Sequence, residues 1–99
     1  MNQEELSLSF INDINNNDFS KINRYFTKES SSYLINENKE LSYNEMIDIL
    51  TKLSKPLEVV RTLKSHVCIK YETKNLDYKV NLYFDIQNRR IKRLELEII

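Results

Sequence analysis

The segment KVNLYFDI, residues 79–86, alternates apolar and polar side chains without interruption. This period of two is typical of a β-strand with one face in the core and the other toward water. The apolar face consists of Val80, Leu82, Phe84 and Ile86. The opposite face consists of Lys79, Asn81, Tyr83 and Asp85. The strand therefore predicts a half-buried sheet whose apolar face is covered by other elements.

The same alternation recurs on both sides of this strand. Residues 66–72 and 93–98 alternate in the same way, and residues 57–63 form a less regular strand. Two polar segments, TKNLD at 73–77 and QNRR at 87–90, have the composition of turns between them. The second half of the chain is therefore expected to contain three or four antiparallel strands.

Helical patterns dominate the first half. An apolar stripe follows a capping-box pattern at Asn2, and this helix is expected to end in residues 15–18, where Asn takes the left-handed conformation. Asp18 is expected to cap a second, short helix that ends at Phe26. Ser42 opens the clearest helix, which stops before Pro56.

Between the second and third helices lies a short predicted strand, SSYLI at residues 31–35, followed by a turn, NENKE at 36–40. The order of elements is therefore helix, helix, strand, helix and then strands. This order predicts an α+β fold in which three N-terminal helices pack on one face of a curved, mainly antiparallel sheet with one short additional strand.

Composition narrows the classes of function. The 99 residues carry 15 basic and 15 acidic side chains, so bulk charge favours neither a nucleic-acid nor a membrane partner. The single cysteine, Cys68, and an acidic N-terminal segment without a signal-peptide pattern fit a cytoplasmic protein. The chain has no Gly or Ala and is rich in Asn, Ile and Lys, a bias expected of an AT-rich bacterial genome. It also lacks any Gly-rich phosphate loop.

The element order, together with Asp18-Phe19, Phe26 and Ser42, resembles the nuclear transport factor 2-like (NTF2-like) superfamily. This superfamily has a cystatin-like α+β fold and includes SnoaL-like cyclases and ketosteroid isomerases. The resemblance covers nearly the whole chain and implies one domain over residues 1–99, with the sheet wrapped around the first helix as a cone-shaped pocket. Isomerase-like members place a Tyr and two Asp residues in that pocket, and the corresponding positions here are Phe10, Leu34 and Leu82. These side chains carry no acid or base, so no catalytic residue, cofactor or metal is expected.

The resemblance also implies which side chains would line the pocket. A largely apolar lining would hold a small apolar ligand, with Tyr33, Tyr71 and Tyr78 as its only hydroxyl groups. Aromatic core packing, with the hydroxyls of these tyrosines and Tyr25 reaching the surface, is the alternative. The expected lining comprises Phe10, Ile14, Tyr33, Leu34, Val67, Ile69, Tyr71, Tyr78, Leu82, Phe84 and Leu96.

Three other groups of residues are candidate sites. His66 and Cys68 could form a nucleophilic pair, but neighbours at i and i+2 on a strand lie about 7 Å apart. With Asp85 and Glu95 they could hold a metal ion, although no spacing enforces a tetrahedron. The basic segment NRRIKR, residues 88–93, is followed at once by acids and is expected to be solvated charge.

The outer face of the sheet is the expected interface of a homodimer, because members of the superfamily commonly pair there. The candidate residues are His66, Cys68, Tyr83, Asp85, Arg93 and Glu95.

Two functions stay open at this point. The first is a non-catalytic SnoaL-like protein that binds a small apolar ligand or a protein partner. The second is a small cyclase or isomerase that uses a Tyr and a displaced acid such as Asp13 or Asp85.

Overall fold

A computed structural model describes residues 3–85 and 90–99 of the chain. Six strands form a single sheet in the order β2-β1-β6-β5-β4-β3. The strands are β1 (Phe26–Leu34), β2 (Lys39–Leu41), β3 (Glu58–Lys64), β4 (Cys68–Lys74), β5 (Tyr78–Asp85) and β6 (Ile91–Ile98). Neighbouring strands are antiparallel except for β1 and β6, which run parallel.

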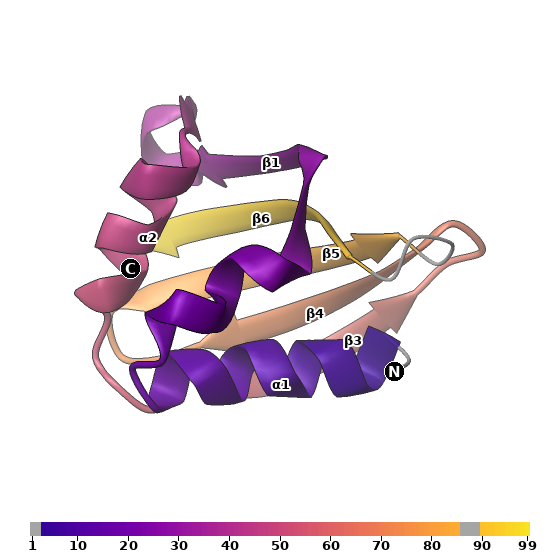
Figure 1. Cartoon of the computed structure of the whole chain (residues 1–99), viewed down its shortest axis with the longest axis horizontal. Helices are drawn as coiled ribbons and strands as arrows, with labels where there is room; N and C mark the ends of the chain where they lie inside the picture. Colours follow the sequence, from indigo (N-terminus) through magenta and orange to yellow (C-terminus); the bar gives the residue numbers. More distant parts are fainter. Residues whose placement is uncertain (1–2, 86–89) are drawn as a thin grey trace.

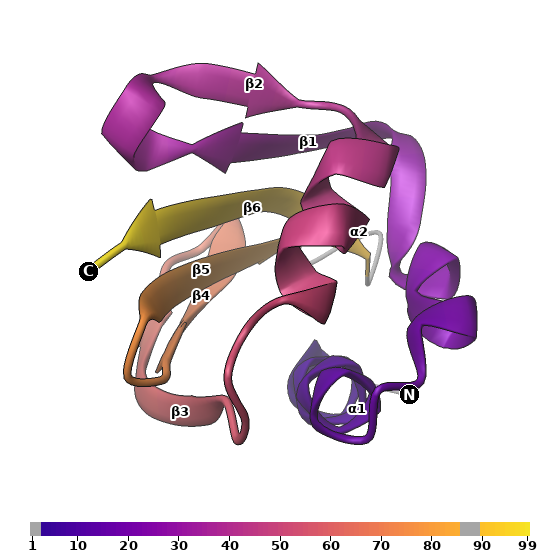
Figure 2. The same ribbon diagram turned by 90° about the vertical axis from the view of Figure 1, so that its left-hand side faces the viewer.

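The helices are the α-helices α1 (Gln3–Asn15) and α2 (Tyr43–Thr51) and the 3₁₀-helices η1 (Phe19–Tyr25) and η2 (Ile35–Glu37). The sheet curls from β2 to β3, with α1, α2 and η1 on its concave side, whereas η2 connects β1 to β2 at the edge (Figures 1 and 2). The α+β class and the curved sheet are therefore confirmed. None of the helices in the described ranges is long and apolar enough to cross a membrane.

The alternation of β5 sets the core, as the sequence predicts. Val80, Leu82 and Phe84 are all fully buried. Leu82 lies directly opposite Tyr71 of β4 and Leu94 of β6, so one row of apolar side chains crosses the middle of the sheet. The stripe of α1 packs onto the inner face of the sheet in the same core cluster. Ile86 lies outside the described residues.

Two asparagines adopt the left-handed conformation that glycine usually fills. Asn17, two residues after the end of α1, has φ 57°, which confirms the predicted stop in residues 15–18. Asn38 has φ 48° and turns the chain from η2 into β2. This turn is tighter than the one predicted over residues 36–40, and it leaves room for a short strand, β2, that the sequence pattern did not indicate.

The second helix differs from its prediction. It is a 3₁₀-helix, and Asp18 makes no capping hydrogen bond to its backbone. The Asp18 carboxylate instead accepts a hydrogen bond from Ser20 Oγ at 3.1 Å and pairs with Lys21 Nζ at 2.8 Å. The chain is already extended from Phe26, so β1 is longer than the predicted strand at 31–35. The predicted cap at Asn2 and most of the predicted turn at 87–90 lie outside the described residues.

The helix α2 begins with the predicted capping box. The Glu45 N–H donates to Ser42 Oγ at 3.1 Å, and the Ser42 N–H donates to Glu45 Oε1 at 3.0 Å. Lys39 Nζ from β2 adds an ion pair to the other carboxylate oxygen of Glu45 at 2.8 Å. This arrangement joins the start of α2 to the end of the short strand β2.

These contacts predict a pH-dependent stability. The hydrogen bonds from Lys39 and from the backbone N–H of Ser42 lower the pKa of Glu45 from 4.5 to about 2. The pKa of Glu45 is lower in the folded state than in the unfolded state. The stabilisation of the fold by the ionised carboxylate is therefore complete above about pH 4.5 and is lost as the pH falls toward 2. We expect Glu45→Gln to lower the free energy of unfolding at neutral pH and to match the parent protein near pH 2, as measured by urea unfolding.

A neighbouring acid provides the control for this measurement. Glu40 is exposed on β2 and takes no part in the capping box. Glu40→Gln should therefore show no such convergence with the parent protein between pH 4.5 and 2. If the difference made by Glu45→Gln were constant over this range, the ionised capping box would not be the source of the stability.

Candidate functional site

The expected pocket between α1 and the sheet is filled by its own lining. A side chain that borders a water-filled cavity keeps accessible surface, whereas Phe10, Ile14, Leu82, Phe84 and Leu96 have none. Leu34 and Tyr71 are also buried, and all seven belong to one packed cluster. Ile69 and Tyr78 are partly buried against the same cluster. These residues therefore act as the core of the fold.

Val67 and Tyr33 do not lie on the inner face. Val67 is 58% exposed because the chain turns at Ser65, whose hydroxyl oxygen accepts the N–H groups of Val67 and Cys68, so β4 begins only at Cys68. Tyr33 stands opposite Glu95 on the outer face, because its neighbours on β1 are the buried residues. Both are corrections to the predicted lining.

The three positions that correspond to isomerase catalytic groups lie in this core. Phe10 packs edge-on against the Tyr25 ring, with centroids 5.2 Å apart, and Leu34 and Leu82 are buried in the sheet. None of the three side chains donates, accepts or carries a proton. No acid–base chemistry follows from these positions.

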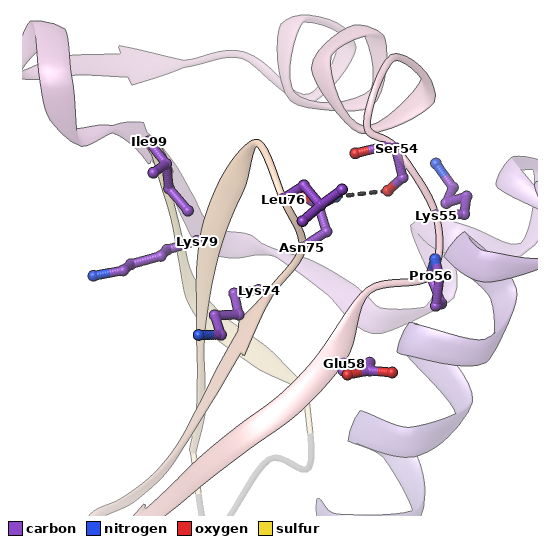
Figure 3. Close-up of a pocket in the computed structure, with 9 residues that line it drawn as sticks. All are labelled: Ser54, Lys55, Pro56, Glu58, Lys74, Asn75, Leu76, Lys79 and Ile99. Atoms are coloured by element: carbon purple, nitrogen blue, oxygen red, sulfur yellow. Dashed lines mark hydrogen bonds between the residues drawn. The ribbon is translucent and has the colours of Figure 1, made fainter.

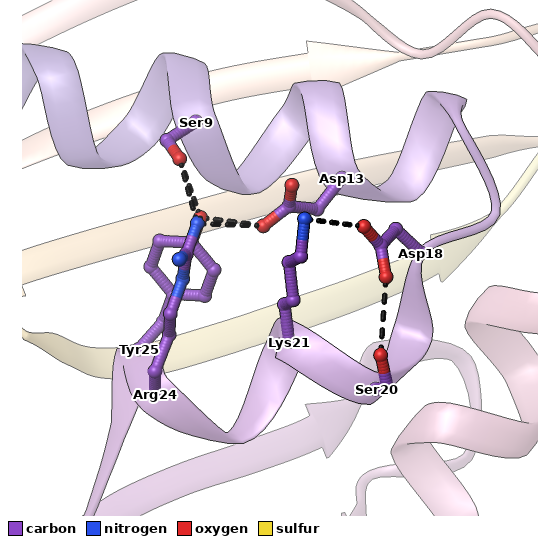
Figure 4. Close-up of polar contacts among 7 residues, drawn as sticks. All are labelled: Ser9, Asp13, Asp18, Ser20, Lys21, Arg24 and Tyr25. Carbon is purple, nitrogen blue, oxygen red and sulfur yellow. Dashed lines mark hydrogen bonds and ion pairs between the residues drawn. The ribbon is translucent and has the colours of Figure 1, made fainter.

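A buried acid does occur on another side of α1 (Figure 4). Asp13 is only 6% exposed, and its Oδ2 accepts a hydrogen bond of 2.6 Å from the Tyr25 hydroxyl. The Arg24 guanidinium donates to the same carboxylate oxygen at 3.1 Å and to the Tyr25 hydroxyl at 2.7 Å. Ser9 Oγ lies 2.6 Å from that hydroxyl. The cluster joins α1 to η1.

The polar groups of this cluster are already hydrogen-bonded to one another, which limits the chemistry they can perform. Burial and the hydrogen bond to Asp13 raise the pKa of Tyr25, so its hydroxyl stays protonated and keeps donating to the carboxylate. No buried side-chain nitrogen or oxygen in the described parts of the chain lacks a partner. Asp13 and Tyr25 are therefore committed to each other and hold η1 in place, as buried polar groups in proteins usually do.

The middle of the outer side of the sheet carries two cross-strand rows of polar and aromatic side chains. We call these ten residues the outer face. The first row is Arg61, Glu72, Asn81, Glu95 and Tyr33, and the second is Leu63, Lys70, Tyr83, Arg93 and Ser31. Each residue is directly opposite the next along its row, so all ten project to the same side of the sheet.

Tyr83 is the centre of this face. Its hydroxyl donates to Glu95 Oε1 at 3.0 Å, and Lys70 Nζ lies 5.4 Å from the centre of its ring. Burial, and then the hydrogen bond to Glu95, raise the pKa of the Tyr83 hydroxyl. Arg93 pairs with Glu95 at 2.8 Å and stacks on the Tyr33 ring at 3.9 Å. The charges are thus largely paired within one chain.

The remaining candidates are dispersed. His66 is exposed in the turn before β4, whereas Cys68 starts the strand, so the two do not share a strand face. Cys68 stands opposite Asp85 on the outer side of the sheet. In the described ranges, no three His, Cys, Asp or Glu side chains group as metal ligands. Of the basic segment 88–93, residues 88 and 89 lie outside the description, and Arg93 belongs to the outer face.

Comparison of the whole chain with known proteins identifies relatives by structure only. No protein-family model matches the sequence. No curated protein matches it either. An NTF2-like protein of unknown function from Cytophaga hutchinsonii superposes with a TM-score of 0.68 at 13% identity, covering 100% of this chain and 91% of that one.

Two further solved structures have the same architecture. AclR, a candidate hydroxylase from Streptomyces galilaeus, superposes with a TM-score of 0.71 at 13% identity, over 98% of this chain and 88% of that one. A candidate SnoaL-like polyketide cyclase from Shewanella denitrificans superposes with a TM-score of 0.66 at 13% identity, over 98% of this chain and 90% of that one. At such low identity the likeness establishes the fold, and the resemblance to NTF2-like proteins seen in the sequence is confirmed at that level.

The filled interior generates a prediction at Leu82, in the middle of the buried row. Leu82→Trp inserts a larger ring where no accessible volume exists, so we expect it to lower the free energy of unfolding by about 1–3 kcal/mol or more. Urea unfolding measures this loss. The parent protein should also bind no apolar fluorescent dye in its interior.

The control places the same ring on the surface of the sheet. Lys92 is exposed on β6, and Lys92→Trp should change the free energy of unfolding by only about 0.5 kcal/mol. An open pocket would give the reverse result. Leu82→Trp would then cost little stability and would abolish dye uptake shown by the parent protein.

Proposed function

We propose that this chain, which has the NTF2-like fold, is a non-catalytic, single-domain cytoplasmic protein that binds a protein partner through the outer face of its sheet. The first such partner is a second copy of the chain, in a homodimer. The observation that carries the proposal is the contrast between the two faces of the sheet. The inner face is filled by core side chains, whereas the outer face presents two tyrosine rings and a leucine beside paired charges.

The contacts of the outer face support an interface of a particular kind. Lys70 pairs with Glu72 at 3.1 Å and Arg93 pairs with Glu95, so these charges need no partner from a second chain. Binding energy would come mainly from the Tyr83 and Tyr33 rings, because Tyr is among the side chains that dominate interface energetics. Mixed faces of this type form wet contacts of moderate strength.

The buried interior favours a protein partner over the small apolar ligand that the sequence also suggested. A ligand inside the sheet would have to displace Leu82, Phe84 or Phe10, each of which has no accessible surface. Opening that space would forfeit close packing around several large side chains. The outer face requires no such rearrangement.

One observation favours a second candidate function, a small cyclase or isomerase. Asp13 and Tyr25 form a short hydrogen bond of 2.6 Å, and an acid with a hydroxyl donor is the pair that such proton transfer uses. Against it stands Arg24, which occupies the same carboxylate oxygen. Asp85, the other acid considered from the sequence, lies on the outer side of the sheet opposite Cys68.

The homodimer is tested at Tyr83. We expect light scattering at tens of micromolar protein to give twice the mass of one chain. Tyr83→Glu places a second acid beside Glu95 and should shift the protein to monomers, because like charges would then crowd the centre of the interface. Val67→Glu, in the exposed turn before β4, is the matched control and should leave the dimer intact. A parent protein that scatters as a monomer would exclude the homodimer.

The absence of catalysis is tested with a β,γ-unsaturated ketone, the substrate type of proton-shuttling isomerases. The purified protein should not accelerate its isomerisation, since Phe10, Leu34 and Leu82 offer no proton-transfer group. Asp13→Asn and Tyr25→Phe serve as diagnostic variants. Turnover by the parent that both variants abolish would establish the Asp13–Tyr25 pair as an active site and refute the non-catalytic proposal.

A further inference from the structure

A second surface feature lies where the α2–β3 connection, the β4–β5 turn and Ile99 meet (Figure 3). It is a groove of about 590 Å³, within the 300–1,000 Å³ that small-molecule sites occupy. Pro56, Leu76 and Ile99 supply its apolar lining, and the charged lining consists of Lys55, Glu58, Lys74 and Lys79. The groove is separate from the filled interior and from the Asp13–Tyr25 cluster.

Hydrogen bonds fix the walls of this groove to one another. The Asn75 side-chain amide donates to the Ser54 carbonyl at 2.6 Å, and the Ser54 hydroxyl donates to Asp77 Oδ2 at 2.6 Å. The Ile99 N–H donates to the Asp77 carbonyl at 2.8 Å. Three segments that are distant in sequence are therefore tied together, and the groove is formed before any ligand arrives, which lowers the cost of binding.

The Leu76 side chain is apolar but does not pack in the core. The β4–β5 turn is held by Asn75, whose Oδ1 accepts the N–H groups of Asp77 and Tyr78, each at 2.8 Å. The Leu76 side chain takes no part in these bonds and is 90% exposed, and Ile99 beside the groove is 66% exposed. Apolar surface gathered at one hollow is a feature of binding sites.

The charged side chains form a cross-strand row over four strands. Glu58, Lys74, Lys79 and Glu97 stand directly opposite one another in that order. The two lysines at the centre extend to the same side of the β4–β5 hairpin (Figure 3), although like charges directly opposite each other destabilise a sheet. Lys79 reaches Glu97 only at 3.8 Å. An anion placed between the two ammonium groups would relieve this repulsion.

We infer that the groove binds a small amphipathic monoanion, with a carboxylate between Lys74 and Lys79 and a short hydrocarbon body against Leu76, Pro56 and Ile99. The flanking carboxylates Glu58 and Glu97 keep the row neutral overall. Glu58 and Glu97 leave room for one negative charge between the two lysines and repel a polyanion. The site therefore distinguishes a carboxylate from nucleic acid.

The test is a titration of the full chain with octanoate, followed by the backbone amide signals in NMR spectra. Saturable shifts are expected at Asn75, Leu76, Lys79 and Ile99. Octanol and octylamine, which lack the negative charge, should bind at least about tenfold more weakly, the loss expected when a charge-assisted hydrogen bond is missing. Equal affinity for octanol, or shifts spread over the surface without saturation, would overturn the inference.

Two pairs of matched variants locate the site. Lys74→Gln should weaken octanoate binding about tenfold, whereas Lys64→Gln, an exposed lysine on β3, should leave it unchanged. Leu76→Ser should weaken it as well, whereas Leu8→Ser, on the exposed side of α1, should not. Lys74 is exposed and stands opposite both Glu58 and Lys79, so Lys74→Gln should fold about as stably as the parent. Equal effects of the paired variants would overturn the site.

Discussion

The structure depends on the register of β5 between its two neighbours. Because side chains alternate along a strand, a slip of one residue would exchange the two faces of the sheet. With Leu82 held opposite Tyr71 and Leu94, the inner face receives the apolar residues. The same register places Tyr83 between Lys70 and Arg93 on the outer face. Core and proposed interface are thus two consequences of one alignment.

The parts of the fold that local chemistry specifies could be predicted from the sequence. The alternation of β5 and β6, the capping box at Ser42 and the left-handed Asn after α1 each depend on residues that are near one another in the chain. The short strand β2 could not be predicted, because three residues carry no period and its pairing with β1 is decided by the turn at Asn38. Val67 was misplaced because strand limits depend on turn contacts such as those of Ser65. Tyr33 was misplaced because its neighbours on β1, and not Tyr33 itself, face the core.

The candidate site was less predictable than the fold. The sequence showed that the isomerase positions are apolar, but whether the interior is open depends on how bulky side chains meet in three dimensions. Here Phe10 and Leu82 fill that space. Asp13 could be named only as a displaced acid, because its partner Tyr25 reaches it when η1 folds back along α1. The row from Glu58 to Glu97 exists only once four strands are aligned.

The position of β6 affects how the chain folds while it is being synthesised on the ribosome. Residues 91–98 lie between β1 and β5 and pair in parallel with a strand that is synthesised some sixty residues earlier. Among the described strands, β1 and β2 pair only with each other until β6 emerges, and α1 and α2 have only part of the sheet to pack on. The N-terminal half must therefore wait in a partly ordered state with exposed apolar surface, which is the condition in which nascent chains engage chaperones.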